Sequence, residues 1–219
     1  MSYPVKLLSI NTAFPACDVA VLEHGRVLAH RREPMTRGQD ARLANLCDEL
    51  LNDARVDMST LSRLAVVTGP GSFTGVRVGV AFARGLALAL NIDCIGVTSL
   101  EAAMPPGYRG PTLGALPAQV RPPDLTYWVQ RFDLGRASAP PAEQDLDDLV
   151  GDLNQQPIPL FGFGLEAIAS EARDVTITPA EPSAITAGKA AMDMRPADHP
   201  PVPVYARAPD AKPMKPPAK

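Results

Sequence analysis

Short apolar segments separated by turn residues mark the first part of the chain, and such segments are typical of β-strands. The predicted strands are residues 6–12, 18–23 and 26–31, with His24-Gly25 as the hairpin turn between the last two. Three consecutive strands therefore open the fold.

The next segments alternate between helix and strand. Residues 38–55 carry apolar side chains at intervals of three and four, which predicts a helix. Strand 61–68, helix 72–91 and strand 93–98 follow, so the order is β-β-β-α-β-α-β. Strands separated by helices imply parallel neighbours covered by helices. This order resembles the ribonuclease-H-like core of the actin, Hsp70 and sugar-kinase superfamily.

The stretch 69–79 joins the predicted strand 61–68 to the predicted helix 72–91. Glycines at positions 69, 71 and 75 allow a sharp turn and a close approach, and Ser72 is placed to cap the helix. A P-loop would need a lysine after its last glycine, and a dinucleotide-binding loop would need its third glycine one residue earlier. The pattern favours glycines used for turning and packing over glycines that cradle a phosphate.

The predicted helix 72–91 is apolar on nearly every side, so more than one of its faces must be covered. Gly75 and Gly79, one turn apart, would let another helix approach closely, while Arg77 and Arg84 mark a second line along the surface. The cover is either this domain's own sheet together with helix 38–55, or a partner protein. The pattern alone leaves both interpretations open.

The composition changes after residue 104, since most of the 24 prolines lie beyond it. Because proline interrupts helices and strands, regular elements should be shorter there. We expect a domain at residues 1–104 and a second, irregular one at residues 105–219 that ends in a proline-rich tail. The expected strands of the second domain are 112–116, 125–132 and 158–163, and its expected helices are 145–154 and 182–192.

Charge, the N-terminal residues and cysteine content indicate where the protein works and what it does not bind. The net charge of -3 argues against binding nucleic acid by bulk electrostatics and leaves a minor RNA contact open. The N-terminal residues lack the pattern of a signal peptide, so we expect a cytoplasmic protein without a membrane partner. The 3 cysteines are widely spaced, which is typical of reduced and buried thiols.

Residues that could carry chemistry are few. His24, His30 and His199 have no spacing that suggests a shared metal ion. The acidic cluster at residues 145–148 lies at the start of a predicted helix, where capping and the helix dipole explain it better than a metal site. The sequence therefore predicts no catalytic, cofactor or metal residue.

Four stretches together resemble the TsaB family, also called YeaZ. They are residues 69–79 (Gly-Pro-Gly-Ser-Phe-Thr-Gly-Val-Arg-Val-Gly), 83–87, 96–102 and 203–213. The resemblance implies two tandem ribonuclease-H-like lobes, the second reduced and irregular. It also implies a non-catalytic subunit that supports TsaD in forming threonylcarbamoyladenosine beside the anticodon of tRNA.

Partners and cofactors follow from the same resemblance. TsaD transfers the threonylcarbamoyl group and TsaE is a small ATPase, so ATP and metal are expected on these partners and no cofactor on this chain. The chain would meet tRNA only through the complex. ATP-using relatives carry Asp-x-Gly at the first hairpin, where this chain has Asn11-Thr-Ala13. TsaD-type proteins carry His-x-x-x-His on the helix that corresponds to 38–55, which has no histidine here.

The resemblance also predicts a partner-binding surface. In this family the two helices of the first lobe pack against the matching helices of TsaD, or against a second copy of the chain when TsaD is absent. The residues carried over to this surface are Ala41, Ala44, Phe73, Gly75, Arg77, Val78, Gly79, Phe82, Ala83 and Leu86.

Two other functions stay open at this point. One is an active ATPase or kinase of the same fold. The other is a direct RNA-binding module that uses a short basic tail made of Arg207, Lys212, Lys215 and Lys219.

Overall fold

The first sheet contains five strands in the order β3-β2-β1-β4-β5. The strands are β1 (Lys6–Asn11), β2 (Ala16–Glu23), β3 (Arg26–Pro34), β4 (Arg63–Gly69) and β5 (Asp93–Thr98). The β1–β2 and β2–β3 pairs are antiparallel, whereas β1–β4 and β4–β5 are parallel. This topology, seen in a computed structural model that describes residues 5–121 and 124–204, confirms the predicted ribonuclease-H-like order.

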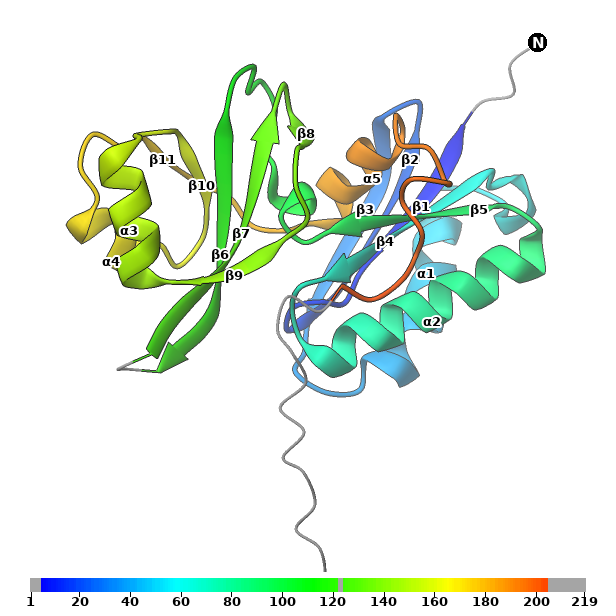
Figure 1. Cartoon of the computed structure of the whole chain (residues 1–219). Coiled ribbons are helices and arrows are strands. Elements are labelled where there is room, and N and C mark those ends of the chain that lie inside the picture. The colour runs from blue at the N-terminus through cyan, green and yellow to red at the C-terminus, as the bar shows by residue number, and fades with distance from the viewer. Residues whose placement is uncertain (1–4, 122–123, 205–219) are drawn as a thin grey trace, which may run out of the picture.

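Helices cover both faces of this sheet (Figure 1). α1 (Gln39–Asp53) and α2 (Phe73–Leu90) lie on one face, and both were predicted within two residues of their ends. α5 (Ala184–Ala191) lies on the other face, where a Cβ added to Gly188 would stand 3.1 Å from the Cβ of Ser9. Side chains alternate along β1, so Leu7 and Ser9 face α5 while Leu8 and Ile10 face the other layer.

The second sheet is also mixed and has the order β11-β10-β6-β7-β8, with β9 pairing to β7. Its strands are β6 (Thr112–Arg121), β7 (Asp124–Asp133), β8 (Arg136–Ala137), β9 (Ala142–Asp145), β10 (Leu160–Gly162) and β11 (Ile177–Pro179). α3 (Leu146–Gln155) and α4 (Glu166–Glu171) pack beside it, and short 3-10 turns occur at η1 (Met58–Thr60) and η2 (Glu101–Ala103). The longer elements were predicted, whereas β8, β9, β11 and α4 were not.

The expected boundary after residue 104 is wrong for α5. Ala184, Ala187 and Ala191 are fully buried in the core of the first sheet, although they come from the second half of the chain. The segment after α5 also returns to this sheet, because Gly96 N donates to His199 O (2.8 Å) and Val204 N donates to Thr68 O (2.8 Å). The first unit therefore includes the C-terminal segment 183–204.

Asp18 holds the start of α5 in place. Its side chain is 1% exposed, and its Oδ2 accepts a hydrogen bond from Ala184 N (2.9 Å) while its Oδ1 accepts one from His30 Nε2 (2.7 Å). A carboxylate at a helix N-terminus is stabilised by the free amides and the dipole. Asp18 on β2 is thus bonded to His30 on β3 and to the start of α5, so His30 has a structural role.

Candidate partner-binding surface

The loop between β4 and α2 fits tightly against the first hairpin. Ser72 N donates to Ala13 O (2.8 Å), and a Cβ added to Gly71 would lie 2.5 Å from that same oxygen. Ser72 caps α2 as predicted, because its Oγ accepts from Gly75 N (3.3 Å). Gly71 therefore lets the loop pack closely against the hairpin.

The inner face of α2 packs against Thr12. Thr12 Oγ1 donates to Gly75 O (2.7 Å), and a Cβ on Gly75 would stand 3.2 Å from the Thr12 carbonyl carbon and closer still to its oxygen. A Cβ on Gly79 would likewise collide with Thr12 Oγ1. Ala83, on the same side, is 0% exposed.

Three of the predicted partner residues are therefore corrected. Gly75, Gly79 and Ala83 face this chain's own sheet, so the close approach that the two glycines allow is to β1 and its turn. The sequence identified small residues that permit close packing but could not say which neighbour they admit.

The outer face of α2 is open to solvent. Phe73 is 56% exposed and Leu88 is 83% exposed, and Ala81, Gly85 and Arg77 are also exposed. At 100° per residue, positions 81, 85 and 88 lie opposite the buried positions 76, 80, 83 and 87. Ala81 and Leu88 are not among the predicted partner residues, although their position opposite the buried stripe could have placed them on this exposed face.

The flank of α2 continues this surface toward α1. Val78, Phe82 and Leu86 are half-buried and contact the core, while Ala41 and Ala44 of α1 are exposed. Seven of the ten predicted residues therefore keep some accessible surface on these two helices; they are Ala41, Ala44, Phe73, Arg77, Val78, Phe82 and Leu86. Their role in binding a partner stays a prediction.

The charge of this surface is positive on one side. α2 contains Arg77 and Arg84 but no acidic residue. The Arg77 guanidinium lies over the Phe73 ring, with its carbon 3.6 Å from the ring centroid. A flat cation stacked on an exposed ring is typical of residues enriched at interfaces.

By length and composition alone, α2 is apolar enough to cross a membrane, and among the described residues it is the one helix of that kind. The core helix of a soluble protein passes the same test. The burial of its inner face against β4 and Thr12 explains part of its apolar character.

The first hairpin has little left with which to hold a phosphate. Asn11 Oδ1 accepts from Ala13 N (3.1 Å), and Asn11 Nδ2 donates to Pro182 O (3.3 Å). Phe14, in the same turn, makes an edge contact with Phe163 of the second unit, at 5.8 Å between ring centroids. Side chains of both units therefore meet directly beside the hairpin.

The other residues that could take part in catalysis or metal binding have structural roles or low reactivity. Asp145 caps α3 by accepting from Asp148 N (3.1 Å), in agreement with the capping interpretation. Burial raises the pKa of the Cys47 thiol to about 12 and that of Cys17 to about 11, which disfavours the reactive thiolate. Within residues 5–121 and 124–204, no three His, Cys, Asp or Glu residues cluster as metal ligands. The basic tail Arg207, Lys212, Lys215 and Lys219 lies outside the described residues.

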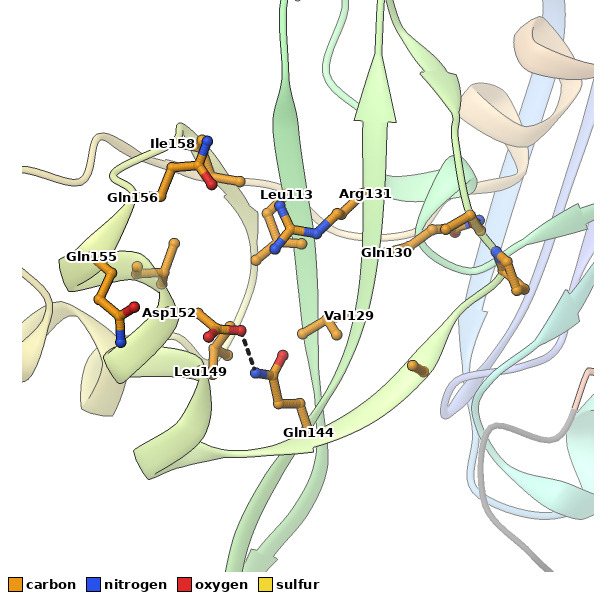
Figure 2. Close-up of a pocket in the computed structure, with 14 residues that line it drawn as sticks. Leu113, Val129, Gln130, Arg131, Gln144, Leu149, Asp152, Gln155, Gln156 and Ile158 are labelled. Atoms are coloured by element: carbon orange, nitrogen blue, oxygen red, sulfur yellow. Dashed lines mark hydrogen bonds between the residues drawn. The ribbon is translucent and has the colours of Figure 1, made fainter.

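A pocket of about 370 Å3 lies in the second unit between α3, β7 and β9 (Figure 2). Its floor is apolar, and Gln144 Nε2 donates to Asp152 Oδ2 (2.9 Å) at its rim. The polar pair is satisfied internally, and the lining contains no Ser, Cys or His to act as a nucleophile or base.

Known proteins of the tRNA threonylcarbamoyladenosine pathway are among those that match this chain. A family model for TsaD, tRNA N6-adenosine threonylcarbamoyltransferase, matches residues 33–116. The tRNA threonylcarbamoyladenosine biosynthesis protein TsaB of Escherichia coli is 35% identical over 130 residues, which are 58% of this chain and 54% of that protein. The chain thus spans about half the length of this relative.

Two further matches cover nearly the whole chain. An uncharacterized protein of Mycobacterium tuberculosis is 32% identical over 213 residues, which are 95% of this chain and 94% of that protein. The solved structure of YeaZ from Pseudomonas aeruginosa superposes with a TM-score of 0.70 over 92% of this chain and 99% of that one, at 24% identity. The latter match concerns the fold, and it agrees with the two mixed sheets described above.

Proposed function

We propose a function for this chain from one premise: it belongs to the TsaB (YeaZ) family. It is a non-catalytic subunit that binds a TsaD-type enzyme, together with a TsaE-type ATPase. The assembly transfers the threonylcarbamoyl group to the adenosine beside the anticodon of tRNA. The chain works in the cytoplasm and meets tRNA through the complex.

The exposed outer face of α2 is the single observation that carries this proposal. An apolar helix face on a well-packed domain marks an interaction site, because water would otherwise contact it. The absence of acidic residues on α2, with Arg77 and Arg84 along one edge, suits a partner helix that is apolar with acidic residues on its flank. A second copy of the chain occupies the same face when the TsaD-type partner is absent.

The assignment as a non-catalytic subunit is supported by the first hairpin. Asparagine at position 11 supplies no negative charge for a hard cation, and its side chain is engaged with Ala13 and Pro182. The Phe14–Phe163 contact lies beside the hairpin, where the superfamily holds phosphates. The chain itself therefore binds no cofactor, and ATP and metal belong to its partners. These observations speak against the ATPase or kinase alternative.

Reconstitution of the reaction tests this function. Purified TsaD-type, TsaE-type and TsaC-type proteins from the same source are mixed with tRNA, threonine, bicarbonate and ATP, with and without this chain. Threonylcarbamoyladenosine should form only when the chain is present, and the chain alone should form none. A chain that completes the reaction unaided, or whose omission changes nothing, would contradict the proposal.

A further inference from the structure

A cleft of about 870 Å3 lies between the two units, away from α2. Most of its lining comes from three segments: the linker 104–109, residues 134–137 of the β7–β8 turn and β8, and α5 with the following turn up to residue 199. In Figure 1, α5 and β8 face each other across this gap. It is larger than the pocket of about 370 Å3 in the second unit.

Positive side chains from all three segments line the cleft. Arg109 comes from the linker, Arg136 from β8 and Lys189 from α5, and Arg109 and Arg136 are exposed. Among the described residues, none of the three forms a side-chain hydrogen bond or an ion pair. They are therefore free to bind an anion.

The acidic residues of the lining are mostly engaged. Glu101 is 7% exposed, and its Oε2 accepts from Thr98 N (2.7 Å). Asp198 forms an ion pair with Arg195 (2.6 Å), so Arg195 already has an acidic partner. Asp193 is the remaining acid in the lining. The lining thus holds four cations (Arg109, Arg136, Lys189 and Arg195) and three carboxylates (Glu101, Asp193 and Asp198), a formal excess of one positive charge on a chain whose net charge is -3.

We propose that this cleft contacts the sugar-phosphate backbone of the tRNA that the complex modifies. Guanidinium groups match phosphate oxygens in geometry as well as charge, and such contacts position RNA without reading its sequence. The cleft, at about 870 Å3, has room for a backbone segment to pass between the two units. This inference rests on the proposed function, because it places the chain in the complex with tRNA.

The cleft and the α2 surface can be occupied together. α5 covers one face of the first sheet, and α1 and α2 cover the other. A partner on the outer face of α2 therefore leaves Lys189 and Arg136 accessible. The chain would thus add an RNA contact on the side away from the protein interface.

Charge reversal in the assembled complex tests the proposal. The test variant combines Arg136→Glu with Lys189→Glu, and the control combines Arg26→Glu with Arg173→Glu, two exposed arginines outside the cleft with the same change in charge. Complex formation is measured first, and tRNA affinity is then measured by fluorescence anisotropy across a salt series. The test variant should form the complex normally, bind tRNA about tenfold more weakly and lower the slope of log K against log salt by about 1 to 2. The control should match wild type.

The outcomes separate this proposal from the proposed function. A wild-type chain that forms no complex overturns both. A normal complex in which the test variant binds tRNA as tightly as wild type, or in which the control loses as much affinity, overturns the RNA contact alone. Protection of the cleft from lysine modification by free ATP but not by tRNA also overturns it, because the phosphate source would then be a nucleotide.

Discussion

A side chain at Gly75 should destabilise the protein, whereas a side chain at Gly85 on the same helix should stabilise it. A Cβ at position 75 would meet the backbone of Thr12, which cannot swing aside as a flexible side chain could, whereas nothing lies within 4 Å of a Cβ at position 85. Alanine is favoured over glycine inside a helix by about 1 kcal/mol. Overpacking costs about 1 to 3 kcal/mol, and disturbing the hydrogen bond from Thr12 Oγ1 to Gly75 O costs about 1 kcal/mol more.

The two substitutions therefore form a matched pair. Gly75→Ala should lower the free energy of unfolding by about 1 to 3 kcal/mol, and Gly85→Ala should raise it by up to about 1 kcal/mol. For a chain of this size each kcal/mol shifts the melting temperature by about 2 to 4 °C, which calorimetry resolves easily. Equal shifts for the two variants, or a Gly75→Ala protein as stable as wild type, would refute the close approach of α2 to Thr12.

Three further predictions concern charge, thiols and α5. Hydrogen bonding to Arg42 lowers the pKa of Glu33 from its usual 4.5, so stability should be full above that value and fall as pH drops through the folded pKa. The free energy of unfolding should therefore change less with pH in this acidic range for Arg42→Met than for wild type. Because burial raises the pKa of Cys47 to about 12, a thiol reagent at pH 8 should label Cys47 only as fast as the protein opens, and rapid labelling in native buffer would contradict this. Asp18→Ala should destabilise the docking of α5 by about 1 to 3 kcal/mol, seen as faster amide exchange in 184–191, and unchanged exchange there would show that Asp18 does not anchor the helix.

The first sheet could be predicted because its signals are local. Short apolar segments, the His24-Gly25 turn and the helical spacing of 38–55 each specify one element, and their order leaves few topologies. The second unit was harder because its elements are short. β11 has 3 residues and β8 has 2, too few for a period to be recognised.

The place of α5 could not be predicted from its own residues. A short helix rich in alanine fits against either sheet, and only the close contact of Gly188 with Leu22 and Ser9, together with Asp18, selects the first. The same reason explains the error at Gly75 and Gly79. Small residues predict that something comes close, but the identity of the neighbour depends on the tertiary arrangement.

The binding of a TsaD-type protein to Ala81→Glu tests the central claim most directly. Ala81 lies exposed in the middle of the outer face of α2, and Ala169 on α4 is an exposed helical alanine for a matched control. Titration calorimetry with Ala81→Glu should show affinity reduced at least about tenfold, because a charge would be buried in an apolar interface, while Ala169→Glu should bind like wild type. Wild-type affinity in a folded Ala81→Glu protein would contradict the assignment of α2 as the partner surface.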